Sequence, residues 1–472
     1  MEEKRESLGS RLGFILLSAG CAIGIGNVWR FPWLAGQYGG AWFVVAYLAF
    51  LALLGVPVMT MEFAMGRAAR RSPAVMYRAL GHPGWGWHGA LSLAGNVLLM
   101  MYYTTVAGWM FTYFAYSASG AFAGMGAGAV GEKFGATLAS PLLQAGPMAA
   151  VVAAGFLVCA AGLRAGLERV TKWLMLALLG LMGVLAVHNV LLPGTAERAL
   201  EDGTRVATSA LDGVRYLLVP SAAAVADHGG WAALLREAMN QAFFTLSLGI
   251  GAMAIFGSYI GRERALAGEA VRVTVLDTAV ALCAGLIVLP ACFAFGVEPG
   301  AGPGLLFVTL PNVFGTMAGG RLWGSLFFVF MSFAAFSTVL AVFENILACV
   351  RDLTGWGRRR AAWVCAAGVF ALSLPCALGW SVLAGWHPMG GESCVLDGED
   401  FLVSSVLLPL GALVYTLFCA HRFGWGWERF AAEANAGRGL KLRPWMRHYC
   451  AWVLPAVVLV VFLRGLWGAL VP

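Results

Sequence analysis

Charge is scarce in this sequence. Only 12% of its 472 residues are charged and 60% are hydrophobic, whereas soluble domains carry roughly 25% charged residues. Enzyme signatures are missing too: there is no HExxH pair, no CxxC pair and no midplane cluster among the seven histidines. These absences exclude an ordinary soluble protein and give no support to an enzyme. They indicate an integral membrane protein built of helices, because a backbone in lipid must satisfy its own hydrogen bonds.

Cysteine does not form a disulfide framework. Nine of the ten cysteines lie within or beside apolar segments, where they behave as small hydrophobic residues. Only Cys394 falls in an expected outer loop, without a partner there, so we expect no disulfide. We also expect no cleavable signal, because the apolar run behind MEEKRESLGSR is too long for one.

Long apolar runs predict eleven membrane spans. Basic residues gather in the connections on one side, most densely in 422–447, which predicts a cytoplasmic N-terminus and, with an odd number of spans, an outer C-terminus. We expect a multi-pass protein of the inner (plasma) membrane. The asymmetry also explains the net charge of +7, so nucleic-acid binding is not expected. The outer loop 193–230 is either a set of short surface helices or an ordinary connector. The expected spans are 12–36, 41–68, 88–119, 147–163, 169–192, 231–259, 268–297, 321–352, 360–380, 400–421 and 447–469.

The first span contains helix-breaking residues where lipid is expected. The stretch SAGCAIGIGNVWRFP holds three glycines and an arginine, and span six, NQAFFTLSLGIGAMAIFGSY, is interrupted in the same way. Close helix packing through small residues is the alternative for either span alone. Two interrupted spans, five apart, favour an inverted-repeat transporter. We expect one all-α transmembrane domain over 1–472, with repeats at about 12–192 and 231–421 and an extra helix at 447–469; this assignment rests on position, because the halves show no convincing sequence similarity.

Six segments form a recognisable set: RLGFILLSAGCAIGIGNVWRFPWLAGQYGGAWF, GVPVMTMEFAMGR, QAFFTLSLGIG, DTAVALCAGLIVLP, AAFST and DGEDF. Together they resemble the neurotransmitter:sodium symporter family, over residues 5 to about 415. The resemblance implies the LeuT-type fold, with 5+5 inverted repeats and unwound first and sixth helices. It also implies sodium-coupled uptake of amino acids or amines. The eleven spans resemble the bacterial amino-acid transporters of the family.

Span eight offers oxygens for a sodium ion. Ala334, Ser337 and Thr338 share one helix face, and the Gly20 and Ile23 carbonyls would complete five oxygens for a hard cation. Serine and threonine in a span often bond back to their own helix instead. The family resemblance favours the ion and makes this the second sodium site. It implies a first site of Ala22, Asn27, Thr245 and Asp277.

Asp277 also bears on chloride. An acid within a span is a functional hypothesis by default, although a protonated structural aspartate is the alternative. The resemblance implies that many family members carry asparagine at this position and that the animal members need a nearby chloride for charge balance. Here Ala281 stands where a chloride ligand or an acid could sit. We therefore expect two sodium ions and no chloride.

The resemblance also implies a substrate pocket. Tyr103 and the amides at Ile25 and Gly26 would bind the α-carboxylate, and carbonyls near Cys21 would bind the ammonium group. Amine transporters carry an aspartate at the Cys21 position, so a neutral cysteine favours an amino acid. An apolar side-chain pocket favours a large hydrophobic or aromatic L-amino acid, because unpaired charges are costly there. The expected contacts are Cys21, Ala22, Ile25, Gly26, Leu99, Tyr103, Phe244, Thr245, Ser247, Ile250, Thr338 and Val342.

The same resemblance implies two gates. Arg30 would pair with Asp400 on the outer side and be oriented by Gln241. On the inner side, Arg5 would pair with Asp352, near Tyr259.

One departure concerns span five, where relatives have a proline that helps the helix unwind. This chain has Leu176 at that position, which leaves the route of inner opening unexplained.

The sequence thus predicts a sodium-coupled amino-acid symporter that works by alternating access. Its partners would be a small-molecule amino acid, sodium ions and the bilayer, with no obligate protein partner. A non-transporting amino-acid sensor of the same fold is the alternative.

Overall fold

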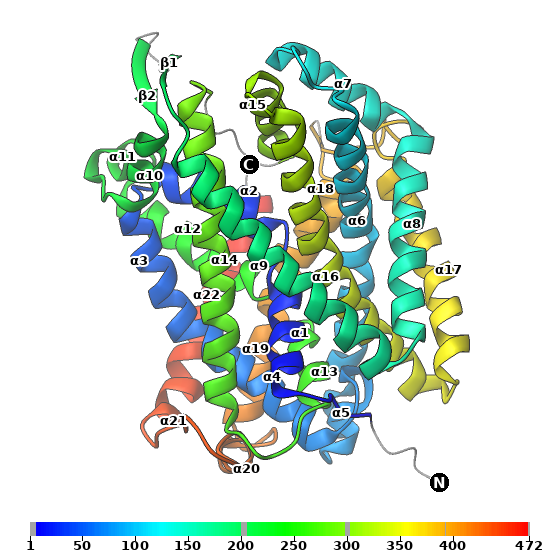
Figure 1. Ribbon diagram of the computed structural model, residues 1–472. Coiled ribbons are helices and arrows are strands. Elements are labelled where there is room, and N and C mark those ends of the chain that lie inside the picture. Colours follow the sequence, from blue (N-terminus) through cyan, green and yellow to red (C-terminus); the bar gives the residue numbers. More distant parts are fainter. Residues whose placement is uncertain (1–5, 200–204, 298–302, 392, 471–472) are drawn as a thin grey trace.

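Almost the whole described chain is helical. The computed structural model describes residues 6–199, 205–297, 303–391 and 393–470. Long helices run side by side between the two ends of a bundle (Figure 1). The first half comprises α1 Arg11–Ala22, α2 Gly26–Gln37, α3 Ala41–Phe50, the π-helix η1 Leu51–Gly55, α4 Val56–Ala69, α5 Pro73–Ala79, the 3-10 helix η2 Pro83–Trp85, α6 Gly86–Ser119, α7 Ala127–Ala139, α8 Pro141–Ala160, the π-helix η3 Leu163–Glu168 and α9 Arg169–Val190.

The second half follows a short hairpin and two small helices. In Figure 1 these lie at the end of the bundle that also carries α7, while α5 lies at the opposite end. The elements are β1 Thr195–Ala199, β2 Arg205–Ser209, α10 Ala210–Leu218, α11 Ala222–Asp227, α12 Gly230–Thr245, α13 Ala252–Gly257, α14 Leu266–Ala294, the π-helix η4 Leu305–Thr309, α15 Leu310–Thr316, α16 Gly320–Thr354, α17 Arg358–Ala377, α18 Val395–Phe401, the π-helix η5 Leu402–Leu407, α19 Leu408–Ala420, α20 Trp427–Ala434, α21 Met446–His448, the π-helix η6 Tyr449–Val453 and α22 Leu454–Leu470.

The described spans correspond to the eleven positions predicted from the sequence. Nine helices are long and apolar enough to cross a membrane within the described ranges, and α1 and α2 together form one further span with a 60° bend. The remaining predicted span, 231–259, is split into α12 and α13, which are each too short to cross alone. The first described residues and the end of α22 lie at opposite ends of the bundle (Figure 1).

The loop 193–230 holds more structure than the sequence analysis foresaw. The short surface helices are present as α10 and α11, but β1 and β2 also pair antiparallel, with Thr195 opposite Ser209. At the start of α10, the Ser209 amide and hydroxyl donate to the Asp212 carboxylate at 2.9 and 2.7 Å. These hydrogen bonds hold the pKa of Asp212 below its usual range, because they favour the charged form.

The break in span one lies between two short helices. α1 ends at Ala22, and Ile23 then adopts an extended conformation with ψ 99°. α2 begins at Gly26, where an added Cβ would lie 2.5 Å from the Phe244 ring. Glycine therefore lets the ring of α12 press directly against the start of α2, which joins the two broken spans.

The break in span six depends on unusual backbone conformations. α12 ends at Thr245, and Ser247, Gly249 and Gly251 all have positive φ, of 49°, 104° and 73°. The freed amides bind Glu62 of α4: Gly249 N–H donates to Oε1 at 2.6 Å and Met253 N–H donates to Oε2 at 3.2 Å. A fully buried carboxylate thus satisfies amides that the helix itself leaves open.

Glycine also lets span ten approach this break. A Cβ added at Gly411 of α19 would lie 2.0 Å from the Gly249 carbonyl oxygen. We expect Gly411→Ala to force α19 away from the break and to destabilise the protein by about 1–3 kcal/mol, the usual cost of overpacking. Thermal unfolding in detergent measures this. Gly368→Ala on α17 is the matched control, because its Cβ meets no atom within 4 Å; equal stability of the two variants would contradict the prediction.

Candidate functional site

A cavity of about 440 Å³ lies where the two broken spans meet. The ends of α1, α2 and α12 form its inner part, and α6, α16, α18 and η5 complete the wall. Most of the residues predicted to contact the substrate therefore line this one cavity. Those that line it are Cys21, Ala22, Ile25, Gly26, Leu99, Tyr103, Phe244, Thr245, Ser247 and Thr338. Two predicted contacts, Ile250 and Val342, are buried but are not among the described residues lining the cavity. The Ile250 side chain packs instead against Gly95 of α6, where an added Cβ would lie 2.9 Å from its Cγ2 atom.

One end of this cavity offers hydrogen-bond donors. The Tyr103 hydroxyl accepts from the Ile25 amide at 3.3 Å, and Tyr103 lines the cavity, where a hydroxyl can donate to a ligand. α2 starts here, and the N-terminus of a helix carries a partial positive charge. Hydroxyl and helix terminus together suit a carboxylate.

Carbonyl groups lie on the other side of the same space. α1 ends at Ala22 and α12 ends at Thr245, so the C-terminal ends of two helices border the cavity. Helix C-termini carry partial negative charge and leave carbonyl oxygens unbonded. A cavity with amides at one end and carbonyls at the other matches a ligand that carries both charges.

Five oxygens converge between the break in span one and α16. The Thr338 hydroxyl lies 3.2 Å from the Gly20 carbonyl oxygen, 3.1 Å from that of Ile23 and 3.4 Å from that of Ala334. The Ser337 hydroxyl lies 3.1 Å from the Gly20 oxygen and 2.9 Å from the Ala334 oxygen. All five groups belong to buried residues. Three carbonyls with two hydroxyls at this spacing fit a small hard cation, and the set equals the predicted second site.

A buried carboxylate marks the predicted first site. Asp277 of α14 is fully buried, and its oxygens accept from Asn27 at 2.8 Å, Thr245 at 2.9 Å and Tyr47 at 3.5 Å. No ion pair with Lys, Arg or His balances it within the described ranges. A buried charge without a counterion is costly, so a monovalent cation fits among these oxygens. The Asn27 amide nitrogen, not its oxygen, faces Asp277 in this arrangement, and Ala22 lies beside the site at the end of α1.

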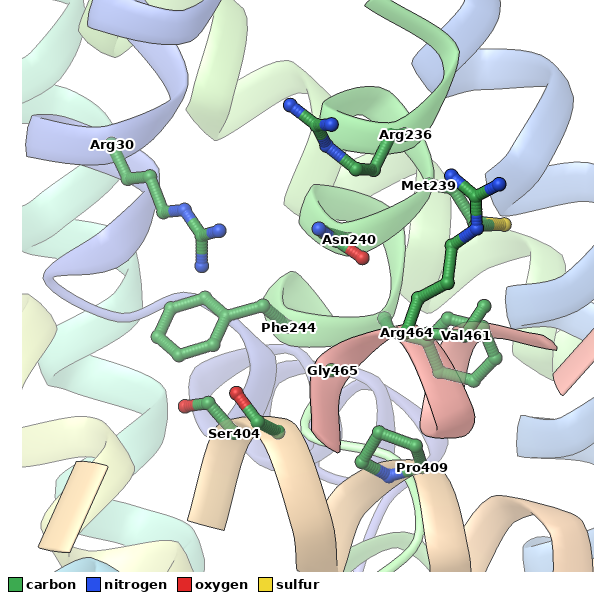
Figure 2. A pocket seen from close by; sticks show the side chains of 12 residues that line it. Arg30, Arg236, Met239, Asn240, Phe244, Ser404, Pro409, Val461, Arg464 and Gly465 are labelled. Atoms are coloured by element: carbon green, nitrogen blue, oxygen red, sulfur yellow. The ribbon is translucent and has the colours of Figure 1, made fainter. Parts of the chain in front are cut away.

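The outer gate residues are present but do not pair as expected. Arg30 and Asp400 both line the cavity, yet Arg30, at the edge of a smaller adjoining pocket (Figure 2), lies 3.9 Å from Glu237 and over the Phe244 ring, at 5.2 Å. Asp400 accepts instead from Tyr102 at 2.9 Å and Ser404 at 2.8 Å. Arg30 and Asp400, both described in the structure, therefore do not form the expected ion pair, because they lie on opposite walls of the cavity.

Gln241 is not engaged with Arg30 either. Its side chain is completely buried, and neither its oxygen nor its nitrogen has a hydrogen-bond partner. The expected orienting contact to Arg30 is thus not made in this conformation.

The inner side carries a second ion pair beside the predicted gate residues. The Tyr259 hydroxyl donates to Glu344 of α16 at 2.8 Å, and Arg358 of α17 pairs with the same carboxylate at 2.5 Å. Asp352 accepts from the Ser72 amide at 2.7 Å, and its expected partner Arg5 lies outside the described residues. Sequence reasoning missed the Glu344–Arg358 pair, although an acid within span eight is by itself a signal of a functional site.

The N-terminal segment closes the inner side further. Glu168, in the π-helix η3, accepts from the Gly9 amide at 2.7 Å and the Ser10 hydroxyl at 2.8 Å. The Leu8 amide donates to the Tyr259 carbonyl at 3.2 Å. The start of α1 is therefore tied to spans five and six at once.

Comparisons with known proteins agree with this architecture. The model of the sodium:neurotransmitter symporter family matches residues 5–124 and 143–469. The uncharacterized sodium-dependent transporter YhdH of Bacillus subtilis is 30% identical over 468 residues, which cover 98% of each chain. The sodium-dependent neutral amino acid transporter B(0)AT2 of Pongo abelii is 26% identical, over 61% of this chain and 40% of its own.

A solved structure is similar over the full length. The crystal structure of MhsT in complex with L-phenylalanine matches with a TM-score of 0.83 and 34% sequence identity, and the match covers 98% of this chain and 100% of that one. A family model matching nearly the whole chain, together with these relatives, decides the assignment: the chain belongs to the sodium:neurotransmitter symporter family, as a sodium-dependent membrane symporter of the LeuT-type fold and not an enzyme.

Proposed function

We propose that this symporter imports a neutral L-amino acid with a large hydrophobic or aromatic side chain, together with two sodium ions and without chloride. The observation that carries the proposal is the cradle of five oxygens between the break in span one and α16, on the border of the central cavity. An ion there joins the broken helix to α16, so its binding shapes the cavity that receives the substrate.

Charge in the cavity supports a zwitterionic substrate. Cys21 is neutral where an amine transporter would need an acid, and donors at Tyr103 and at the start of α2 suit a carboxylate. Leu99, Val106 and Phe244 give the wall an apolar part, which favours an apolar side chain. The similar protein MhsT was solved with L-phenylalanine, and this agrees with the proposed class.

The chloride independence rests on Asp277. Its buried carboxylate supplies a fixed negative charge beside the first sodium site, and the neighbouring position one turn on is Ala281, which offers no side-chain ligand to an anion. We assign Ala22, Asn27, Thr245 and Asp277 to this site, with the substrate carboxylate as a further ligand.

We also propose how alternating access proceeds. Arg30 and Asp400 approach across the outer cavity once substrate is bound, while Gln241 turns to support Arg30. The inner ties at Tyr259 and at Glu168 then release. The N-terminus lies in the cytoplasm and the C-terminus outside, in the inner (plasma) membrane; no protein partner is required. The 5+5 repeats at about 12–192 and 231–421 provide the two halves.

Substrate class and coupling are tested together. In a thermal-shift screen of the twenty amino acids, we expect large apolar or aromatic ones to stabilise the protein in sodium and not in potassium. Proteoliposomes should accumulate the same amino acid only with an inward sodium gradient, and equally well when gluconate replaces chloride. Binding without accumulation would favour the sensor alternative, and loss of uptake in gluconate would refute the role given to Asp277.

The second sodium site is tested with paired hydroxyl variants. Thr338→Ala removes one of five oxygens from the cradle, so we expect the sodium concentration for half-maximal substrate binding to rise by at least about tenfold, or about 1.4 kcal/mol. Ser332→Ala on the same helix is the control, since its buried hydroxyl bonds only to its own helix, at the Phe328 carbonyl. Sodium titration of both variants decides: similar curves would remove Thr338 from the site.

The inner gate is tested with neighbouring arginines. Arg358→Gln leaves the buried Glu344 without its cation, and breaking such a pair costs about 3–5 kcal/mol. We expect the variant to favour inner opening, with weaker substrate binding and faster labelling of a cysteine introduced at Ser18, a buried residue of α1 outside the oxygen cradle. Arg359→Gln, at an exposed neighbour, should leave both unchanged. Unchanged labelling in the Arg358 variant would argue against a gate at Glu344.

A further inference from the structure

A pocket of about 240 Å³ lies at the end of the bundle that carries α7 and α15 (Figure 1). It is formed by the end of α6, the turn that follows α6, the end of α15 and the start of α16. No described residue lines both this pocket and the central cavity. Among the described residues of its wall, Ser117 and Arg321 are the two whose side chains can donate a hydrogen bond.

Arg321 brings a positive charge to the pocket. Its Nε atom donates to the Ala118 carbonyl oxygen at 2.6 Å, which fixes the guanidinium group against the end of α6. The terminal nitrogens of this group form no ion pair or hydrogen bond with the part of the chain that the structure describes. No aspartate or glutamate occurs among the described lining residues. The pocket therefore holds a positioned cation without a compensating acid in its described wall.

Ser117 adds a buried donor. Its side chain is only 4% exposed, and its hydroxyl has no hydrogen-bond partner among the described residues. A serine within a helix often donates to a carbonyl one turn back, as Ser325 does to Arg321 at 2.6 Å. A buried polar group without a partner is costly. The Ser117 hydroxyl therefore favours a ligand in this pocket that can accept a hydrogen bond.

The start of α16 supplies a third donor. This helix begins at Gly320 and runs for 35 residues, so its N-terminus carries a partial positive charge. The amides of Gly320 and Leu322 donate to carbonyls just before the helix, at 3.0 and 2.9 Å. The Arg321 amide between them has no hydrogen-bond partner within the described ranges. A guanidinium group, a hydroxyl and a helix N-terminus together suit an oxyanion.

We propose that this pocket binds a phosphate group, either as inorganic phosphate or as the headgroup of a lipid, through Arg321, Ser117 and the start of α16. A guanidinium group binds phosphate through two parallel hydrogen bonds. Leu322, beside Arg321, is an apolar side chain that is 59% exposed, as expected of a surface near lipid. The proposal does not depend on the transported substrate, because the pocket and the central cavity have no described lining residue in common.

The physical effect is on the segment 303–317. Pro303, at its start, lines the central cavity, whereas Phe314 and Met317, near its end, line the phosphate pocket. The elements η4 and α15 lie between these points. A phosphate group on Arg321 and Ser117 links the end of α6 to the start of α16 around the end of α15. Its binding therefore restrains the segment that borders the central cavity.

The test is thermal unfolding of the full chain in dodecyl maltoside, with inorganic phosphate titrated against gluconate at constant ionic strength. We expect the wild-type Tm to rise with phosphate concentration. Ser117→Ala and Arg321→Gln should each raise the apparent Kd for phosphate at least about tenfold, because each removes a hydrogen bond to a charged ligand. Without phosphate, Ser117→Ala should be at least as stable as the wild type, because it removes a buried hydroxyl that has no described partner.

Matched controls lie close by. Ser119 is exposed on the same helix and donates to the Tyr116 carbonyl at 2.9 Å, and Arg215 is exposed on α10, outside the pocket. Ser119→Ala and Arg215→Gln should keep the wild-type phosphate titration. A wild-type Tm that does not respond to phosphate would overturn the proposal. An unchanged apparent Kd in Ser117→Ala would also overturn it, even if Arg321→Gln does not fold.

Reconstitution distinguishes the two sources of phosphate. Nanodiscs of phosphatidylcholine offer a lipid phosphate, whereas nanodiscs of digalactosyldiacylglycerol contain none. If a lipid headgroup occupies the pocket, inorganic phosphate should stabilise the protein in the galactolipid and not in phosphatidylcholine. If free phosphate is the ligand, its apparent Kd should be the same in both. Either result supports the phosphate site, and no stabilisation by inorganic phosphate in the galactolipid would count against it.

Discussion

The structure depends on one constraint: where two helices break inside the bundle, their freed amides and carbonyls need partners that water cannot supply. An unsatisfied buried polar group costs about 1–3 kcal/mol. Glu62 satisfies the amides of the break in span six from a neighbouring helix. The carbonyls of the break in span one meet the Ser337 and Thr338 hydroxyls of α16 instead. A hydroxyl gives one proton only, so several carbonyl lone pairs stay open, and a cation is the partner that can satisfy them together.

Much of this could be read from the sequence because it is local. Glycines and a proline within a span indicate a helix break whatever the tertiary contacts are. The i, i+3, i+4 spacing of Ala334, Ser337 and Thr338 likewise places these residues on one helix face without reference to any tertiary contact. The resemblance to a known family then connected these local signals across the chain. Pairing of β1 with β2 was not predicted, since strand register depends on a partner segment and not on local pattern.

The gates were harder to predict for a different reason. An ion pair between mobile walls depends on the conformational state, so the sequence could name Arg30 and Asp400 but not their partners in this state, Glu237, Tyr102 and Ser404. The open outer cavity and the tied inner side belong to the same state. With the Arg30–Asp400 pair apart, the opposite end of the bundle is held by Glu168 and by the pair of Glu344 with Arg358, and this difference between the two ends supports the alternating access proposed above.

Span five lacks the proline that the family resemblance leads one to expect, but it carries an irregular turn of its own. The resemblance implies a proline at the position of Leu176, whereas here the π-helix Leu163–Glu168 interrupts the α-helical pattern more than two turns before that position. A Cβ added at Gly166 would lie 2.1 Å from the Val158 carbonyl oxygen, so the π turn packs tightly against the end of α8. Farther along α9, Met175 approaches the Gly20 position, the first carbonyl of the oxygen cradle. Because Glu168 of this π turn also accepts hydrogen bonds from the N-terminal segment, one irregular turn connects the start of α1 to α9, the helix that packs beside the oxygen cradle.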